Sequence, residues 1–318
     1  MYNVEKYALQ CIESIEAQNF RDFELIIVDD GSTDSTSEIL EGAKKIYSNM
    51  VVIHKENGGL TSARKAAAEK AIGDYVFIID GDDYIDADCL KQFADVITDC
   101  HPDVVVSGYK KTFSDGSFKE INAVPGNLCG LYIDNDINEN VLSNIFSIST
   151  TVWAKAINRE LYLSVQMKLY DSITMGEDGC IVYPVLSNAK SIFFLSKYPY
   201  YYRYNDESMT KSKKKYISWN SCLDRISFIE ENLSLDKCHL EEQFSKYVIH
   251  ACFNAVITQM RKERFLSVRR NAIEILTTDR IERYFKVREL YLSRNEKLMK
   301  LLLKYRMFLI IKIVSIIR

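Results

Sequence analysis

Proline and glycine are scarce in this 318-residue chain, with 4 prolines and 12 glycines, and no internal repeat or low-complexity segment is evident. This composition is typical of an ordinary globular protein. The 8 cysteines form no CxxC pair and have no histidines at zinc-site spacing, so we expect reduced, mostly buried thiols. No signal-peptide pattern opens the sequence, which makes the cytoplasm the expected compartment. The net charge of -3 gives no reason to expect a nucleic-acid partner.

Helical and strand patterns alternate through the first third of the chain. Apolar runs predict buried strands at residues 25–28 and 75–79 and further strands at 50–54 and 103–107, with amphipathic helices between them. The segment Ser35-Thr36-Ser37-Glu38 fits a capping box at the start of one helix. This alternation indicates an α/β fold with a mostly parallel sheet flanked by helices. Further strands are expected at 109–121 and 191–204, and the pattern is helical from Tyr216 onward.

Two acidic clusters directly follow two of the predicted strands. Asp29 and Asp30 come after residues 25–28, and Asp80-Gly81-Asp82-Asp83 comes after residues 75–79. In an open α/β sheet, ligands bind outside the carboxyl ends of the strands, and carboxylates clustered there repel one another unless a cation lies between them. Mg²⁺ or Mn²⁺ prefers oxygen ligands and retains waters and substrate phosphates beside one or two carboxylates. The sequence therefore predicts a divalent metal that carries a phosphate.

Asp80-Gly81-Asp82 is a DxD motif, in which one carboxylate is directed toward a sugar hydroxyl or ribose and the other onto a metal. A calcium loop of the EF-hand kind is one alternative, but it needs glycine at its sixth position, where Ile85 stands. An acidic surface turn that binds nothing is another alternative. The buried strand before the motif, and the second cluster at Asp29, favour the binding interpretation.

The other charged candidates also have ordinary explanations. A helix-start signal accounts for Ser32 and Asp34 but not for two carboxylates after a buried strand, so we interpret Asp30 as a nucleoside-recognising residue. Arg64 is either a solvent-exposed charge on a helix or a cation that neutralises the negative charge of the pocket. The Glu177-Asp178 pair, taken alone, would be the solvated start of a helix.

Four motifs occur in a fixed order: YNVEKY at residues 2–7, VDDGSTD at 28–34, NGGLTSAR at 57–64 and DGDD at 80–83. This set resembles glycosyltransferase family 2 enzymes of the GT-A fold, which have a Rossmann-like sheet, over roughly the first 110 residues. Residues 153–155, 176–178 and 201–203 are similar to later landmarks of members that build bacterial capsule and exopolysaccharide.

The resemblance implies transfer of a sugar, with inversion, from a nucleotide diphosphate donor, usually UDP-linked, to a saccharide or polyprenyl-linked acceptor. By that analogy the metal, Mn²⁺ or Mg²⁺, stabilises the departing diphosphate while a carboxylate on the opposite face removes the acceptor proton. Asp30 would contact the uracil and Asp80 the donor ribose or sugar. The implied site comprises donor-binding Asp29, Asp30, Arg64 and Asp80, metal-binding Asp82, and catalytic Asp178, with Glu177 as the next candidate for the base.

One departure from the family pattern concerns the start of the sheet. In the family a strand rich in Val and Ile precedes Tyr-Asn, whereas here Met1 stands directly before Tyr2. We therefore expect the first strand to be missing and its neighbours' hydrogen bonds to be unmet. A truncated or inactive nucleotide-sugar-binding protein is thus one alternative function. A sugar nucleotidyltransferase is another, although its Gly-rich, basic loop does not occur in residues 2–7.

The last 22 residues of the chain differ from the rest in charge and apolar content. Residues 297–318 contain no acidic residue, and a single helix there would place Lys297, Lys300 and Lys304 beside a broad apolar surface. Such a helix either lies at the inner face of the cell membrane or packs on its own domain or on a partner subunit, and its lysines prevent it from spanning. We expect a nucleotide-sugar-binding half at 1–110, an acceptor-binding half at 111–215, and a helical region at 216–318 with a membrane-associating tail.

Overall fold

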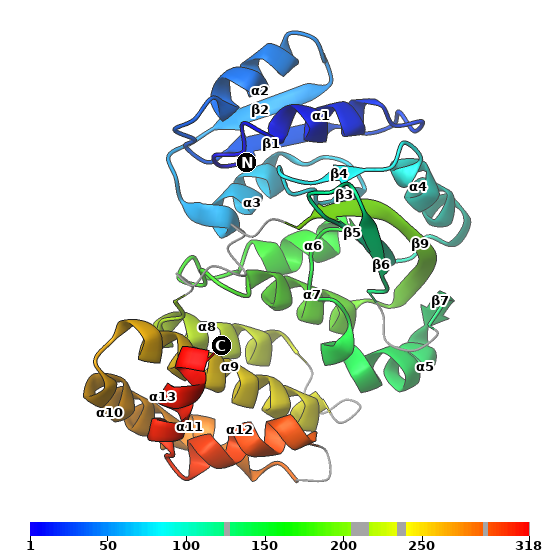
Figure 1. Ribbon diagram of the computed structural model, residues 1–318. Coiled ribbons are helices and arrows are strands. Elements are labelled where there is room, and N and C mark those ends of the chain that lie inside the picture. The colour runs from blue at the N-terminus through cyan, green and yellow to red at the C-terminus, as the bar shows by residue number, and fades with distance from the viewer. Residues whose placement is uncertain (124–127, 205–215, 234–239, 289–291, 318) are drawn as a thin grey trace. The chain divides into compact units, whose positions relative to one another are not determined.

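The computed structural model describes residues 1–123, 128–204, 216–233, 240–288 and 292–317. The chain divides into two compact units, Met1–Asp206 and Glu207–Arg318. The first unit contains α1 (Ala8–Glu16), β1 (Leu25–Asp29), α2 (Thr36–Lys44), β2 (Met50–His54), α3 (Gly59–Lys70), β3 (Tyr75–Phe77), β4 (Tyr84–Ile85), α4 (Cys89–Cys100), β5 (Val104–Thr112), β6 (Phe118–Ile121), β7 (Gly130–Ile133), α5 (Asp134–Asp136), the short helical turns η1 (Ile137–Val141) and η2 (Leu142–Ser147), β8 (Lys155–Asn158), α6 (Arg159–Gln166), α7 (Glu177–Asn188) and β9 (Ser191–Arg203) (Figure 1).

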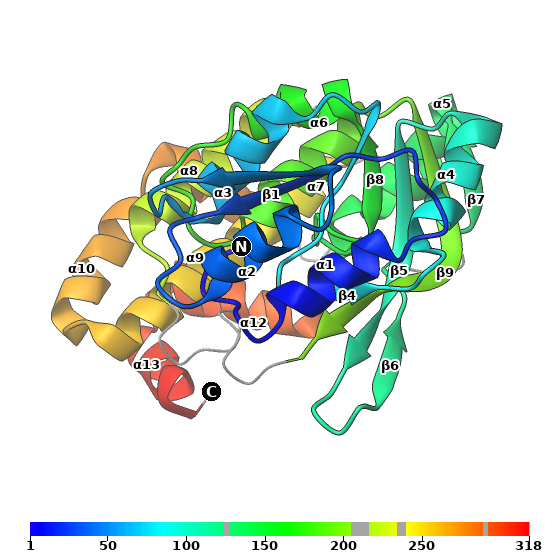
Figure 2. The ribbon, with the colours of Figure 1, turned by 90° about the horizontal axis from the view of Figure 1, so that it is seen from above.

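The strands of this unit form two sheets. β1 and β2 pair in parallel, and the larger sheet has the order β3-β8-β5-β9-β4, with β6 on β5 and β7 on β9. β5 and β9 are parallel, but the other pairs of the larger sheet are antiparallel. The α/β prediction is confirmed, and the mostly parallel sheet is corrected to a mixed one. The later strands cause the difference, because β8 enters antiparallel between β3 and β5. Figure 2 shows β6 extending with β5 as a hairpin.

Helices cover both faces of the β1–β2 pair: α2 lies over one face and α3 over the other (Figure 1). Met1 lies along the remaining edge of β1. Its amino group donates to the carbonyl of Val28, and the Asp30 N–H donates to the carbonyl of Met1, which is the pattern of a parallel pair. Among the described strands, β1 pairs only with β2 and β3 only with β8. No described strand joins the two sheets.

The predicted capping box at Ser35 does not form, since the Ser35 side chain makes no capping hydrogen bond. Asp34 caps the helix instead, with Oδ1 accepting the Thr36 N–H at 3.0 Å, and the Glu5 carboxylate accepts the Ser35 N–H at 3.0 Å. A tertiary contact with Glu5 thus replaces the local contact that the motif suggests. The start of α2 is thereby tied to the segment before α1.

An aromatic stack lies at the centre of the first unit. The indole of Trp153 stacks on the rings of Tyr200 and Tyr202, with centroids 4.6 and 5.4 Å apart. Tyr109 meets the same indole edge-on at 4.7 Å. Because the stack joins β5, β9 and the residues before β8, it holds the larger sheet close to the acidic residues that follow β3.

The second unit is helical, as predicted. It comprises α8 (Trp219–Asn232), α9 (Leu240–Lys262), α10 (Phe265–Leu276), α11 (Asp279–Glu282), the turn η3 (Arg283–Lys286), α12 (Arg294–Lys304) and α13 (Phe308–Ile317). α8, α10, α12 and α13 all contact α9, which buries residues around most of its circumference. The domain boundary predicted between residues 215 and 216 adjoins residues 205–215, which lie outside the described residues. Its position therefore stays a prediction.

The tail is two helices rather than the single helix expected. The chain turns between them at Arg306, which has a left-handed backbone with φ 56°. Lys300 is buried and donates to the carbonyl of Val287 at 2.8 Å, so it does not belong to an exposed basic edge. Four apolar tail residues are buried in the unit: Leu302, Leu303, Phe308 and Ile311. Within the described residues, no helix has the length and apolar content needed to cross a membrane.

Candidate active site

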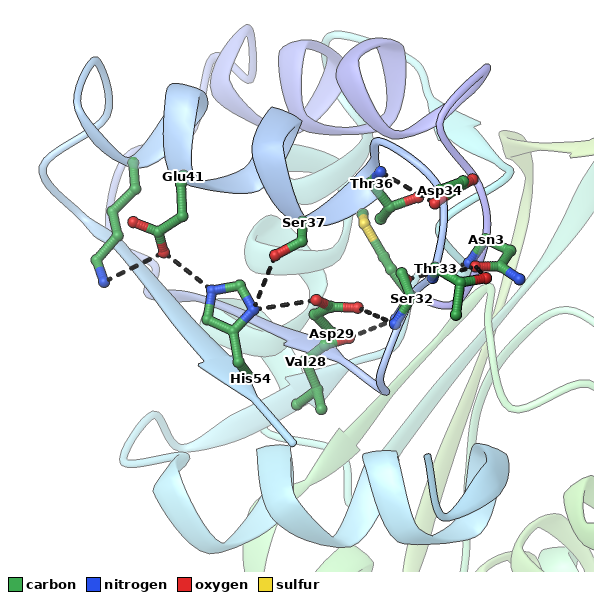
Figure 3. Close-up of polar contacts among 12 residues, drawn as sticks. Asn3, Val28, Asp29, Ser32, Thr33, Asp34, Thr36, Ser37, Glu41 and His54 are labelled. Carbon is green, nitrogen blue, oxygen red and sulfur yellow. Dashed lines mark hydrogen bonds and ion pairs between the residues drawn. The ribbon is translucent and has the colours of Figure 1, made fainter. Parts of the chain in front are cut away.

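The carboxylate of Asp29, at the end of β1, is engaged on both sides (Figure 3). Oδ1 accepts the Ser32 N–H at 3.0 Å, and Oδ2 lies 3.0 Å from Nδ1 of His54. The other ring nitrogen of His54 lies 2.9 Å from the Glu41 carboxylate. Burial opposes ionisation of Asp29, but the hydrogen bonds from Ser32 and His54 hold its pKa below the ordinary value. Asp29 therefore shapes the turn after β1.

Asp30 holds the turn that leads into α3. Its Oδ1 accepts hydrogen bonds from Lys55 Nζ at 2.7 Å and from the Gly58 N–H at 3.0 Å, and its Oδ2 accepts the Gly59 N–H at 2.7 Å. The N-terminus of a helix attracts a carboxylate because its N–H groups are unpaired and its dipole is positive. Asp30 thus fixes the start of α3, and Oδ2 retains capacity for one more donor.

Met1 brings the two acidic clusters together. Its backbone pairs with Val28 and Asp30 at the end of β1, while its side chain lies against Gly81, where an added Cβ would be 2.5 Å from Met1 Cγ. Burial lowers the pKa of the terminal ammonium, and the nearby carboxylates of both clusters, Asp80 foremost, oppose that effect. These contacts bring the ends of β1 and β3 close together.

The carboxylates of the DxD motif are difficult to ionise together. Burial raises the pKa of Asp80 to about 6, with repulsion from Asp178 and Asp82 adding to the effect and Arg64 opposing it. Burial also raises the pKa of Asp82, against the charge of Arg203. Such groups favour a cation between them. The described residues contain no cluster of three or more metal-ligating side chains, yet one or two carboxylates suffice for a metal that also binds diphosphate and water.

Arg64, on α3, belongs to the pocket. Its guanidinium is 7% exposed and donates to Asp178 Oδ1 at 2.5 Å through Nη1 and to Asp80 Oδ1 at 3.4 Å through Nη2. Burial opposes the positive charge, but the two carboxylates keep the pKa of Arg64 above its ordinary value. The solvated-charge alternative for Arg64 does not hold. One cation therefore links the DxD motif to the Glu177-Asp178 pair.

Glu177 and Asp178 begin α7, directly after Gly176, whose backbone is left-handed with φ 80°. Burial, and then the neighbouring Asp178, raise the pKa of Glu177. The helix N-terminus stabilises negative charge at both positions. Because Asp178 contacts Arg64, the pair lies beside Asp80 rather than at a solvated helix start. The structure thus brings Asp178, Arg64 and Asp80 into one site, although they are spread over more than a hundred residues.

A buried hydrogen-bond chain that the sequence motifs did not predict lies beneath the DxD motif. The Tyr200 hydroxyl donates to Asp83 Oδ2 at 2.7 Å and accepts the Asp80 N–H at 3.2 Å. Asp83 Oδ1 accepts the Arg203 N–H at 2.8 Å. Burial, together with the charges of Asp80 and Asp82, raises the pKa of Asp83 to about 8. The fourth position of DGDD, and the Tyr-Tyr-Arg landmark at 201–203 directly after Tyr200, were the available signals for this support.

A buried lysine also lies near the candidate base. Lys155 is 1% exposed, and its Nζ donates to the carbonyl of Thr151 at 2.5 Å. Burial lowers the pKa of Lys155 to about 7, and Asp178 opposes that shift. The segment 153–155 was noted as a motif without any assigned role. Lys155 holds the loop that carries Trp153, which stacks on Tyr200.

Comparison with protein families identifies a known domain in the first half of the chain. Residues 1–153 match the model described as glycosyl transferase family 2. These residues are a glycosyl transferase family 2 domain. The match contains the Asp29-Asp30 turn, Arg64 and the DxD motif. Glu177 and Asp178 lie beyond the matched residues, so their roles are not assigned by it.

Two bacterial relatives extend the similarity past the family 2 domain. The glycosyltransferase EpsJ of Bacillus subtilis is 29% identical over 212 residues, which cover 66% of this chain and 61% of EpsJ. The poly(ribitol-phosphate) β-N-acetylglucosaminyltransferase TarS of Staphylococcus aureus is 27% identical over 253 residues, covering 78% of this chain and 42% of TarS. The matched region therefore spans less than two thirds of each relative.

Solved structures confirm the fold predicted for the family 2 domain. The crystal structure of S. aureus TarS 1–349 with UDP gives a TM-score of 0.71 at 21% identity, covering 99% of this chain and 88% of that one. A mannosyltransferase from Pyrobaculum calidifontis, in complex with GDP-Man and Mn²⁺, gives a TM-score of 0.50 at 13% identity, covering 99% and 84%. The fold is the GT-A glycosyltransferase fold.

Proposed function

We propose that this chain is an inverting glycosyltransferase that moves a sugar from a UDP-sugar to a saccharide acceptor in cell-surface polysaccharide synthesis. The observation that carries the proposal is the placement of Arg64 between Asp80 of the DxD motif and Asp178. The groups that bind the donor and the base that activates the acceptor must both lie near the anomeric carbon of the donor sugar. Arg64 contacts both Asp80 and Asp178 and so keeps these two carboxylates close together. The family 2 domain and the UDP-bound structure of TarS support a nucleotide-sugar donor.

We assign the metal to Asp82, with Mn²⁺ or Mg²⁺ as the expected ion. The raised pKa values of Asp80 and Asp82 support this assignment, because two crowded carboxylates gain from a shared cation. A divalent ion at this position supplies positive charge to the departing diphosphate. Asp80 then faces the donor sugar or ribose, and Asp30, through its remaining Oδ2 capacity, faces the base of the nucleotide. The Mn²⁺ bound to the mannosyltransferase supports a divalent metal.

We assign the general base to Asp178. Its Oδ1 is held by Arg64, which leaves Oδ2 for the acceptor hydroxyl. A carboxylate in this position takes the acceptor proton as the hydroxyl attacks the anomeric carbon from the face opposite the diphosphate. Glu177 is the next candidate, since it stands beside Asp178 in the first turn of α7.

Three variants test these assignments in an assay of UDP-sugar hydrolysis and transfer. We expect Asp178→Asn to bind donor and metal normally and to lose transfer by about 10²-fold or more, the usual scale for a general base. We expect Asp82→Asn to lose both turnover and metal-dependent UDP binding. Asp171→Asn is the matched control, because Asp171 is 76% exposed and, within the described residues, its carboxylate pairs with Lys65 alone. Full transfer by Asp178→Asn would move the base to Glu177, and full activity in excess chelator would remove the metal.

We further propose that the helical unit contacts a membrane surface and that the acceptor is a lipid-linked saccharide. The support is an apolar face of α13 that remains exposed: Leu309 is 69% exposed, Ile313 57% and Ile316 73%. Soluble monomers rarely expose contiguous apolar patches without a binding role. Substitution is a better test than removal of residues 297–318, because Leu303 and Phe308 are buried in the core of this unit.

A further inference from the structure

A cavity opens on the helical unit, and none of the candidate active-site residues lines it. Its volume is about 210 Å³, and α10, the turn η3, α12 and the start of the α12–α13 connection surround it. It is lined by Ile273, Leu276, Thr277, Glu282, Phe285, Lys286, Leu303, Lys304 and Arg306. All of these residues belong to the second unit. The cavity is therefore a feature of this unit alone.

The lining combines an apolar floor with a cationic rim. Phe285 and Leu303 are buried, whereas Lys286, Lys304 and Arg306 are exposed at the rim. Glu282 is the only acidic residue among the lining residues. In the described part of the chain, no carboxylate forms an ion pair with any of the three cations. Three unneutralised cations above an apolar floor favour an anionic ligand with an apolar portion.

The size of the cavity limits what it can enclose. Pockets that bury most of a drug-sized ligand measure roughly 300–1,000 Å³. At about 210 Å³, this cavity holds a headgroup and the first carbons attached to it rather than a whole amphiphile. The remaining hydrocarbon of such a ligand stays outside the cavity, where another apolar surface must contact it.

The exposed apolar residues of α13 begin just beyond the cavity. Arg306 lines the cavity, and Leu309 stands three residues later, followed by Ile313 and Ile316 at helical spacing on the exposed side. A helix that lies in a membrane interface places such a face at the acyl boundary and its cations at the level of the headgroups. A bilayer with anionic lipids thus supplies both the anionic headgroup for the cations and the acyl region for the apolar face of α13.

We propose that this cavity binds the phosphate headgroup of an anionic membrane phospholipid while the exposed face of α13 lies in the interface. Lys286, Lys304 and Arg306 contact the phosphate oxygens, and the first acyl carbons pack on Phe285 and Leu303. This inference rests on the proposed membrane contact of the unit and gives it a defined lipid site. It is independent of sugar transfer, because none of these residues belongs to the candidate active site.

Vesicle flotation of the full chain tests the site, with phosphatidylcholine vesicles that contain or lack phosphatidylglycerol. The test variant combines Lys286→Gln, Lys304→Gln and Arg306→Asn. Asn tolerates the left-handed backbone that Arg306 adopts, so the fold is retained. We expect each lost cation to lower binding about fivefold, the equivalent of roughly 1 kcal/mol, and the triple variant to lose about 100-fold at low salt. Added salt reduces the binding of the wild type.

The matched control removes three exposed cations of the same unit that do not line the cavity: Arg264→Gln, Arg269→Gln and Arg270→Gln. It carries the same change in net charge, so general electrostatic attraction predicts equal losses in both triple variants. We expect the control to retain most of its binding. Equal losses, or no loss in the test variant, would overturn the lipid site, as would wild-type protein that ignores anionic vesicles. UDP-sugar hydrolysis, measured in the same samples without vesicles, reports separately on the proposed function.

Discussion

The guanidinium of Arg64 donates a 2.5 Å hydrogen bond to the carboxylate of Asp178, although 114 positions separate the two residues in the chain. The same guanidinium reaches Asp80. Arg64 is therefore the point at which the family 2 domain, residues 1–153, meets the candidate base supplied by α7. Its removal leaves two carboxylates facing each other without a cation.

Arg64→Met is expected to destabilise the first unit. Breaking a fully buried ion pair costs roughly 3–5 kcal/mol; here Asp178 is 23% and Asp80 31% exposed, so water screens part of the charge and we expect about 2–3 kcal/mol. Urea unfolding measures the loss. Lys65→Met is the control, because its pair with the exposed Asp171 is worth about 1 kcal/mol or less. Similar losses in the two variants would contradict the linking role of Arg64.

Tyr200→Phe removes a hydroxyl that is fully buried between Asp80 and Asp83. The buried Asp83 oxygen then loses its donor, which costs about 1–3 kcal/mol, and the DxD turn loses its anchor. We expect a lower melting temperature and a weaker metal-dependent UDP affinity. Tyr202→Phe keeps the same stacking on Trp153 and removes a hydroxyl that makes no hydrogen bond within the described residues. If Tyr202→Phe weakens UDP binding equally, the hydroxyl of Tyr200 does not position the motif.

His54 makes stability depend on pH near neutrality. Hydrogen bonds to Glu41 and Asp29 raise the pKa of His54 above its ordinary value of 6.5 (Figure 3). A raised pKa means that the folded state holds the proton more tightly, so this contribution is fully present below pH 6.5 and is lost as the pH rises through the folded value. His54→Gln should remove that decline from a series of thermal melts. An unchanged pH profile in the variant would show that His54 does not titrate in this way.

Lys155 should produce the opposite slope at higher pH. Burial lowers the pKa of Lys155 from 10.5 to about 7, so the unfolded chain binds more protons between those values. Stability attributable to this group therefore rises as the pH increases from 7 to 10.5, because the cost of a buried charge disappears. Lys155→Met keeps the length of the side chain and carries no charge. Denaturant melts should show the rise in the wild type and a flatter profile in Lys155→Met; a parallel rise in both would exclude Lys155 as its source.

Local sequence patterns were sufficient to predict those elements whose structure depends mainly on residues that are close together in the chain. The apolar runs at 25–28 and 50–54 form β1 and β2, because an uninterrupted apolar run bounded by turn residues favours a strand; β1 is largely buried, whereas β2 leaves Val51 exposed. The acidic residues that follow directly on the runs at 25–28 and 75–79 were also expected at strand ends, but β1 and β3 lie in different sheets and Met1 brings their ends together. The helical character of the second unit was likewise readable from its periodicity.

Long-range contacts decided the rest. Ser35 and Ser293 both precede a glutamate by three residues, yet only Ser293 forms the capping box, because Asp34 and Glu5 occupy the start of α2. The tail becomes two helices because Leu302, Leu303, Phe308 and Ile311 are buried in the unit, which requires the turn at Arg306. Arg64 was ambiguous in the sequence because a helix shows its own spacing but not its tertiary partners. Which charges are solvated and which are paired depends on surfaces that residues far apart in the chain create together.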